Sequence, residues 1–219
     1  MILYELIGSE NHDLYRSLEL SNGNRQYDFL RSIIGTAIDA QKIFLSQHVI
    51  KAFNFQAITC LHTNPGEYRP CPVQVVSGNV VIFAPPEFYR VQALMDDFVN
   101  VVNSSWSTVD PLVLATFVLW RLNFIHPFIN GNGRTARATC YFVLCLRAGY
   151  WLPGTTILPE LIKRERDAYC MALAQVDVSF AAGNLDLSPL HTLLDRLLQE
   201  QLASAGIELE PVEDVSPVE

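Results

Sequence analysis

The sequence predicts a mostly α-helical domain that carries a single β-hairpin. Three observations predict it: apolar residues recur at helical spacing over most of the chain, one short β-rich segment interrupts them, and no alternating strand–helix units indicate a parallel sheet. Half of the 219 residues are hydrophobic and 17% are charged. A chain of this length and composition can bury a sizeable core.

Helical apolar spacing defines most of the expected elements. The helix that runs through Leu119 toward Ile125 is apolar on nearly all sides, which places it in the centre of the fold. Ser107 or Thr108 is expected to cap it, with Pro111 in its first turns. The other helices are expected over residues 26–40, 43–62, 87–103, 134–147, 158–175 and 188–204.

The β-rich segment covers residues 67–84. Valine and isoleucine cluster on either side of Ser77-Gly78-Asn79, which is the pattern of two strands joined by a tight turn. Pro70 and Pro72 suit an edge strand, and Pro85-Pro86 ends the segment. The segment is therefore expected to form one hairpin.

Charge and cysteine content limit the partners and the compartment. The net charge of −8 disfavours binding to a phosphate backbone, so no nucleic-acid partner is expected. The five cysteines are odd in number and contain no CxxC pair, which indicates reduced thiols in the cytoplasm. Polar residues such as Arg121 and Asn123 interrupt the apolar runs, so no membrane association is expected.

The stretch from His126 to Arg137 carries the most chemical information. Pro127 disfavours helical backbone at the preceding residue, so the central helix should stop at His126. A glycine-rich loop, residues 129–133, follows and leads into a helix that is expected to start at Arg134. The N–H groups of such a loop and the positive end of the next helix can together bind an anion.

Two arginines and a histidine complete this stretch. Arg134 and Arg137 are three residues apart, so they share one helical face, and guanidinium groups bind phosphate oxygens in a bidentate manner. A neutral imidazole at His126 can accept the proton of an incoming hydroxyl. Each feature alone is typical of an ordinary turn, a structural histidine or solvated arginines, but their contiguity favours a catalytic phosphate site.

The string HPFINGNGRTAR, residues 126–137, resembles the signature HPFx(D/E)GNGRxxR of the Fic (Fido) family and departs from it at Asn130. The resemblance extends over roughly residues 40–200. It implies a Fic-type helical bundle with an N-terminal helical extension over residues 1–39, a catalytic domain over 40–205 and an acidic, disordered tail over 206–219.

This resemblance implies a protein adenylyltransferase that moves AMP from ATP to a serine, threonine or tyrosine of an unidentified target protein or of itself. It implies His126 as the catalytic base and Phe128 as the structural anchor of the loop. The implied nucleotide-binding residues are Gly131, Asn132, Gly133, Arg134 and Arg137. The hairpin resembles the family's flap, which clamps the target by strand addition, with Val73, Val75, Val80, Val81 and Ile82 as its target-binding residues.

Asn130 stands where the family has Asp or Glu, which bind the Mg²⁺ that bridges the phosphates. A neutral amide oxygen replaces a carboxylate, the ligand that Mg²⁺ prefers, so a weakened or altered metal requirement is expected. Two alternatives stay open: the transfer of another group, such as UMP, phosphocholine or phosphate, and a degenerate module that binds nucleotide without catalysis. Intact Gly131, Gly133 and Arg137 favour nucleotidyl transfer over the kinase-like branch of the family.

Many Fic proteins are inhibited by a helix carrying (S/T)xxxE(G/N), whose glutamate pairs with the second arginine of the signature. The chain holds no intact copy: residues 17–22 have Ser21 where glutamate is expected, and Glu10-Asn11 has Leu6 at the Ser/Thr position. Inhibition is therefore absent, or it comes from an inhibitory partner chain or from Glu19.

Overall fold

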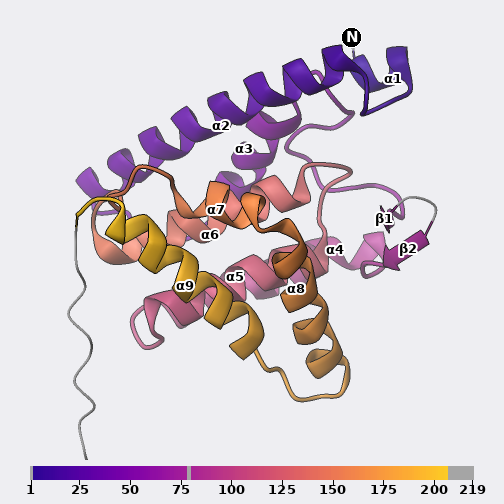
Figure 1. Cartoon of the computed structure of the whole chain (residues 1–219). Coiled ribbons are helices and arrows are strands. Elements are labelled where there is room, and N and C mark those ends of the chain that lie inside the picture. The colour runs from indigo at the N-terminus through magenta and orange to yellow at the C-terminus, as the bar shows by residue number, and fades with distance from the viewer. Residues whose placement is uncertain (1, 78–79, 207–219) are drawn as a thin grey trace, which may run out of the picture.

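The computed structural model describes residues 2–77 and 80–206. Over these residues the chain forms helices and one two-stranded antiparallel sheet (Figure 1), which confirms the mostly helical fold with a single hairpin. The α-helices are α1 Leu3–Ile7, α2 Asp13–Asp39, α3 Gln47–Ile58, α4 Val91–Ser104, α5 Pro111–Ile125, α6 Asn132–Ala148, α7 Leu158–Arg164, α8 Arg166–Ala181 and α9 Ser188–Ala203. The strands are β1 Val75–Ser77 and β2 Val80–Phe83, and a 3₁₀ turn, η1, spans Phe88–Arg90.

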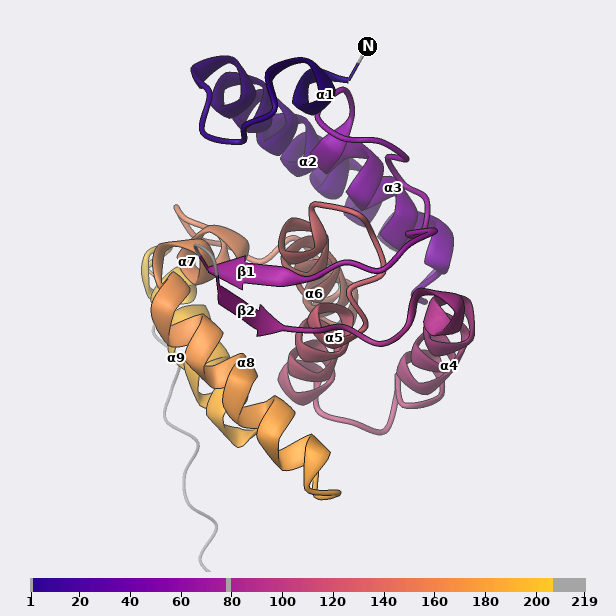
Figure 2. The ribbon, with the colours of Figure 1, turned by 90° about the vertical axis from the view of Figure 1, so that its right-hand side faces the viewer.

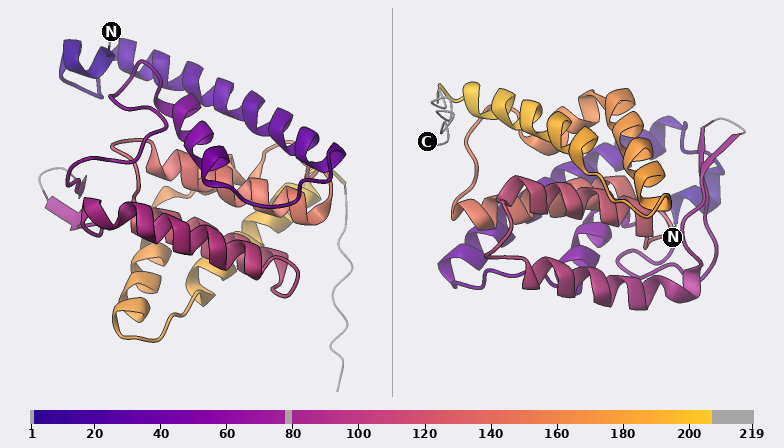
Figure 3. Two further views of the ribbon diagram at one scale, coloured as in Figure 1. Left: turned by 180° about the vertical axis from the view of Figure 1, so that it is seen from behind. Right: turned by 90° about the horizontal axis from the view of Figure 1, so that it is seen from below.

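Helices α5 and α6 form the centre of the molecule. They pack against each other along their lengths, with α2 and α3 on one side and α8 and α9 on the other (Figures 1 and 3). Trp120, Tyr141 and Phe142 are buried between these layers, and burial of a side chain of this size contributes about 2 kcal/mol. The loop that joins α5 to α6 is therefore held by the most deeply buried pair of helices.

The cap of α5 differs from the expectation. Asp110, not Ser107 or Thr108, accepts hydrogen bonds from the backbone N–H groups of Leu112 (2.8 Å) and Val113 (3.1 Å). Asp110 lies directly before Pro111, which fills the first helical position where a missing N–H costs nothing. The expected residues end the preceding turn instead, too far from the helix to cap it.

Several helix boundaries also differ from the expectation. Helix α3 covers Gln47–Ile58 and not 43–62, α4 begins at Val91 and not at 87, and α8 ends at Ala181 and not at 175. Helix α2 begins at residue 13 and not at 26. The apolar pattern missed its first half because the buried face carries the polar side chains Asn22 and Gln26. The helix expected over 158–175 is broken at Glu165 into α7 and α8. Helix α6 begins at Asn132, two residues before the expected start.

The hairpin is shorter than the β-rich segment. Val75 pairs with Phe83 and Val76 with Val81, with a register shift between these two pairs, and Val73 lies before β1. Figure 2 shows the hairpin lying across the α5–α6 pair, between α8 and α4. The expected turn at 78–79 and nearly all of the expected acidic tail lie outside the described residues, and the domain boundaries stay predictions. Among the described helices, none is long and apolar enough to cross a membrane.

Candidate active site

His126 is the first residue after α5, as the Pro127 rule predicts. Its backbone adopts a left-handed conformation, with φ 51° and ψ 57°, and its N–H donates to Leu122 O at 3.0 Å. A left-handed backbone is unusual for a residue other than glycine, and it turns the chain sharply out of the helix. The turn leaves the imidazole at the mouth of the loop, with most of its surface shielded by neighbouring segments.

The hydrogen bond of the imidazole assigns its tautomer. His126 Nδ1 lies 3.3 Å from Asn123 O, and since a carbonyl only accepts, Nδ1 carries the proton and donates it. Nε2 is left with a lone pair, as a general base requires. Burial, together with the positive charge of Arg69, lowers the pKa of His126 from 6.5 to about 4, so the imidazole is neutral at pH 7.

The loop after His126 is closed by two side chains. Phe128 is fully buried and packs on Tyr68, with 5.5 Å between ring centroids, and its role as the anchor of the loop stays a prediction. The Asn132 amide bonds the main chain of Phe128 at both ends, accepting from its N–H and donating to its C=O, each at 2.9 Å. The Asn132 side chain is thus directed at the loop itself, and only its backbone N–H remains for an anion.

Gly131 makes the sharpest part of the loop. It has φ 75°, and a Cβ at this position would lie 2.5 Å from Ile58 Cγ2 and 3.2 Å from Asn54 Nδ2. Both the conformation and the space therefore require glycine. Close approach to α3 is the physical reason for a glycine here.

Asn54 of α3 holds the loop through hydrogen bonds of its side-chain amide. Its amide is fully buried and donates to Asn130 O at 2.9 Å and to Thr135 Oγ1 at 3.3 Å, while its oxygen accepts from Gly66 N–H at 3.0 Å. Sequence reasoning missed this residue. The available signal was a polar side chain inside the apolar pattern of residues 43–62.

The N-terminus of α6 forms the candidate anion site. The first N–H groups of a helix have no acceptor within the helix, and no partner is found among the described residues for the N–H groups of Asn132, Gly133 and Arg134. Arg137 folds back over Gly133, since a Cβ on Gly133 would lie 3.3 Å from Arg137 Nη1. A helix end and a guanidinium therefore face the same space.

Arg137 is partly buried and, within the described part of the chain, makes no hydrogen bond or ion pair. Burial lowers its pKa, while Tyr169 and Glu160 oppose that effect. A guanidinium keeps its charge even when its pKa falls, because the unperturbed value is far above neutral. Arg137 is thus a charged donor with unused hydrogen-bonding capacity beside the helix end.

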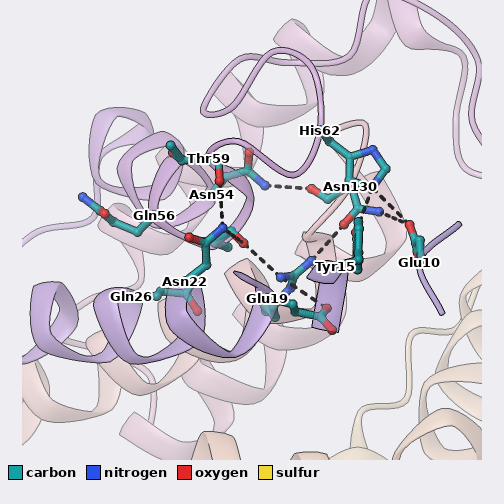
Figure 4. Close-up of polar contacts among 12 residues, drawn as sticks. Glu10, Tyr15, Glu19, Asn22, Gln26, Asn54, Gln56, Thr59, His62 and Asn130 are labelled. Carbon is teal, nitrogen blue, oxygen red and sulfur yellow. Dashed lines mark hydrogen bonds and ion pairs between the residues drawn. The ribbon is translucent and has the colours of Figure 1, made fainter. Parts of the chain in front are cut away.

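Arg134 has different surroundings. Its guanidinium donates to Ala57 O and Asn130 Oδ1, each at 2.9 Å, and lies 3.4 Å from the Glu19 carboxylate of α2. Figure 4 shows Glu19 on α2 directed toward the loop that carries Asn130. Of the two signature arginines, Arg137 is the one open to a ligand, whereas Arg134 is held by protein groups.

Asn130 does not form a metal site with its neighbours. Its Oδ1 already accepts from Arg134, and its Nδ2 donates to the Glu10 carboxylate at 3.0 Å (Figure 4). Glu10 also contacts His62 at 3.1 Å, and His62 lies 2.9 Å from the Tyr15 hydroxyl. Among the described residues, no group of three or more His, Cys, Asp or Glu side chains could hold a metal ion. These residues do not fit a protein-built Mg²⁺ site.

The hairpin presents apolar side chains next to this loop. Val80, Val81 and Ile82 are exposed by 64%, 47% and 58%, and Val75 is partly buried. Phe83 packs on Phe124 of α5, with 5.9 Å between ring centroids. A two-stranded sheet with exposed valine and isoleucine is a surface for pairing with another strand.

Comparison with known proteins agrees with this geometry. Residues 44–144 match the sequence profile of the Fic/DOC family. The chain is 37% and 38% identical, over 112 residues, to the protein adenylyltransferases Fic of Drosophila willistoni and Drosophila yakuba. These matches cover 49% of this chain and 20% of each relative, so the chain spans about a fifth of the length of the curated relatives it matches.

The fold is also similar to solved structures. A Fic domain containing signaling protein from Bacteroides thetaiotaomicron superposes with a TM-score of 0.68 at 25% identity. That superposition covers 93% of this chain and 76% of the other. The helical bundle with its hairpin therefore has a counterpart over nearly the full length of the chain.

Proposed function

The chain carries a Fic/DOC-family domain over residues 44–144, and from this premise we propose that it transfers AMP from ATP to a hydroxyl of a protein. The observation that supports this most directly is the pairing of a neutral, partly buried imidazole with a helix N-terminus and the guanidinium of Arg137, which has no partner among the described residues. A base and a phosphate cradle separated by one tight loop suit transfer from a polyphosphate. The adenylyltransferase relatives supply the choice of AMP as the transferred group.

The proposed reaction is a displacement at the α-phosphorus of ATP. His126 Nε2 takes the proton of the target hydroxyl as the hydroxyl oxygen bonds to phosphorus. The bond from phosphorus to the oxygen of the β-phosphate breaks, and pyrophosphate leaves. The N–H groups of α6 and Arg137 stabilise the charge on the phosphates. The low pKa of His126 makes its imidazolium a strong acid, which gives the proton to solvent water after pyrophosphate has left.

We propose the hairpin as the target-binding element. An extended target segment adds to the sheet through main-chain hydrogen bonds, so its side chains can vary, and its serine, threonine or tyrosine points to His126. Val73, Val75, Val80, Val81 and Ile82 line the segment that receives it. The target is a protein, not a nucleic acid or a membrane, and a segment of a second copy of this chain is included as a target for auto-modification.

The metal requirement is part of the same proposal. The side chain of Asn130 offers no free oxygen, so ATP itself has to supply the main ligands of any Mg²⁺ that accompanies it. We propose a weakened or altered Mg²⁺ requirement and a cytoplasmic setting, which the cysteine content favours.

Two labels on ATP test this function. If AMP is transferred, protein labelling follows ³²P at the α-position; if phosphate is transferred, it follows ³²P at the γ-position. We expect α-label on protein with the wild-type chain and none with His126→Ala. Label from the γ-position alone would assign a kinase-like reaction, and labelling by a UTP or CDP-choline donor alone would assign UMP or phosphocholine transfer.

One observation favours a second candidate, a binding module without turnover. Glu19 lies against Arg134 and Glu10 against Asn130, so two positions of the signature are engaged by the chain itself. This candidate predicts that calorimetry detects ATP binding while no donor labels any protein. Binding without labelling would support the module and contradict the transferase.

A further inference from the structure

Arg69 is a buried cation between the active-site turn and the hairpin. It lies in the segment that leads from α3 to β1, and 3% of its surface is exposed. Its backbone N–H donates to Pro127 O at 2.9 Å. Its guanidinium donates to His126 O at 2.8 Å, to Cys71 O at 3.3 Å and to Pro86 O.

These acceptors belong to three segments. His126 and Pro127 form the turn of the proposed base, Cys71 lies before β1, and Pro86 lies after β2. One side chain therefore bonds the base's own peptide and both ends of the hairpin. The planar fork of a guanidinium can reach several carbonyls in fixed directions, which a lysine ammonium cannot do.

Stability alone does not explain this cation. Within the described residues Arg69 forms no ion pair with a carboxylate, so carbonyl oxygens are what compensates its buried charge, and burial lowers its pKa. Apolar residues in place of buried charges are often neutral or stabilising. The position nevertheless suits a cation, because His126 O lies at the negative C-terminal end of α5.

The contact to His126 bears on the geometry of the base. His126 has a left-handed backbone, φ 51°, that few residues other than glycine adopt. Its carbonyl is directed by Arg69 Nε, which holds the peptide in this conformation. Without that bond the turn would lose the contact that fixes the direction of the His126–Pro127 peptide.

We propose that Arg69 is a positioning residue that couples the target-binding hairpin to His126. By bonding Cys71 and Pro86 as well as His126, it keeps a strand docked on the hairpin in fixed register with the imidazole. The inference rests on the proposed function of the site, and it assigns to one buried side chain the alignment of the target hydroxyl with the base.

Arg147 offers a matched control. It is a partly buried arginine whose guanidinium, like that of the more deeply buried Arg69, bonds main-chain carbonyls, those of Trp106 and Val109, but it does so at the opposite end of α5. A helix of this length separates the two ends by about 20 Å. Arg69→Lys and Arg147→Lys therefore make the same chemical change, one beside the hairpin and one far from it.

The test compares both variants and Arg69→Met with the wild type by amide hydrogen exchange in β1 and β2, ATP calorimetry and transfer to a protein target. For Arg69→Lys we expect exchange in the hairpin to quicken at least about tenfold, ATP affinity to stay within about twofold, and kcat for the protein target to fall by about a hundredfold. Arg147→Lys leaves all three near wild type.

A fourth readout follows the imidazole by NMR, with His126→Ala to assign its signal. Arg69→Met removes the positive charge and raises the pKa of His126, whereas Arg69→Lys leaves it nearly unchanged. The proposal is overturned if Arg69→Lys exchanges and transfers like the wild type, or if Arg147→Lys causes the same losses. Hydrogen exchange and NMR need no turnover, so a wild type without transfer refutes the proposed function while these readouts still decide the role of Arg69.

Discussion

At the scale of single residues, His126 sets the pH behaviour. Its pKa is about 4 in the folded chain against 6.5 for a free imidazole. The unfolded chain therefore binds a proton between these values that the folded chain does not, and stability falls as pH drops through that window. At neutral pH and above, both states are neutral and this penalty is absent.

Two consequences are measurable for this histidine. Between pH 7 and pH 5, the free energy of unfolding measured with denaturant should fall by about 2 kcal/mol more for the wild type than for His126→Ala. Transfer by the wild type should stay nearly constant from pH 7 to pH 5.5, because the base remains neutral. A fall in transfer with a midpoint near 6.5 would show that the imidazole titrates as if exposed, against its enclosed position.

Gly131 and Gly149 form a second matched pair. Both are left-handed, with φ 75° and 80°, but a Cβ on Gly131 meets Ile58 at 2.5 Å, whereas a Cβ on Gly149 meets nothing within 4 Å. Alanine at either position should cost about 1 kcal/mol for the backbone conformation. Gly131→Ala should cost about 2 kcal/mol more and weaken ATP binding at least about tenfold, because the loop must shift.

Thermal unfolding and ATP calorimetry check this pair. Gly149→Ala is the control for the cost of placing alanine in a left-handed backbone conformation, and its ATP affinity should equal that of the wild type. Equal stability and equal ATP binding of the two variants would show that α3 tolerates a side chain at position 131.

At the scale of elements, α3 supports the loop through Asn54. Leucine at this position removes the hydrogen-bond partner of Asn130 O and of Gly66 N–H. Each group left without a partner should lower the free energy of unfolding by about 1–3 kcal/mol. Asn22 of α2 is the control, since it is equally buried and its amide donates to Thr59 O at 2.9 Å and to Ala57 O at 3.4 Å, with no bond to residues 126–133 among the described residues. Both leucine variants should lose stability, and only Asn54→Leu should weaken ATP binding.

Chemical denaturation together with ATP calorimetry separates these effects. If Asn22→Leu weakened ATP binding as much as Asn54→Leu, the loss would follow from general destabilisation, and the role of Asn54 under the loop would be refuted.

Helix α2 acts on the loop through Glu19. The ion pair with Arg134 is 3.4 Å long and its Glu19 side chain is 44% exposed, so the pair contributes at most about 1 kcal/mol. Glu19→Gln should therefore raise ATP affinity by no more than about fivefold, since Arg134 then turns to the phosphates at lower cost. Calorimetry checks this, with Glu200→Gln, which breaks a pair with Arg164 on the other side of the molecule, as the control. An affinity that is unchanged or lower in Glu19→Gln would mean that Glu19 does not compete for Arg134.

Sequence patterns predicted these elements where one physical signal dominated. The apolar run of α5, the Pro127 stop and the β-rich hairpin were each readable, because burial and backbone restriction are local properties. The first half of α2 was missed because the buried side chains of Asn22 and Gln26 donate to the α3 carbonyls of Ala57 and Phe53. Such contacts join residues far apart in the sequence, so no local pattern contains them. Asn54 and Arg69 were missed for the same reason.

At the scale of the whole molecule, the site is assembled from distant parts of the chain. The loop between α5 and α6 carries His126 and leads into the N-terminus of α6; α3 holds that loop from one side, and the segment around Arg69 joins it to the hairpin. The N-terminal segment adds Glu10 and Glu19 against Asn130 and Arg134 (Figure 4). Nucleotide binding is thus expected to depend on α2 and α3 as well as on the signature itself.

The same arrangement explains which site residues the sequence could name. Residues 126–137 were identified because their functional groups are contiguous. The sequence offered Glu19 as an inhibitory residue, and in the fold its carboxylate lies 3.4 Å from Arg134, the first arginine of the signature and not the second. The contact between Glu10 and Asn130 joins residues more than a hundred positions apart and became visible only in three dimensions. The two arginines that the motif places on one helical face have different surroundings: Arg134 contacts Ala57, Asn130 and Glu19, whereas Arg137 makes no hydrogen bond within the described part of the chain. Their joint role at the phosphates stays a prediction.

The most direct test of the central claim is intact-protein mass spectrometry of the purified chain and a lysate after incubation with ATP, with and without Mg²⁺, beside His126→Ala. The account predicts an AMP-sized addition on the chain or on a lysate protein that is absent with His126→Ala. An addition that persists in His126→Ala, or no addition with the wild type under any metal while ATP still binds, would contradict the assignment of a transferase with His126 as its base.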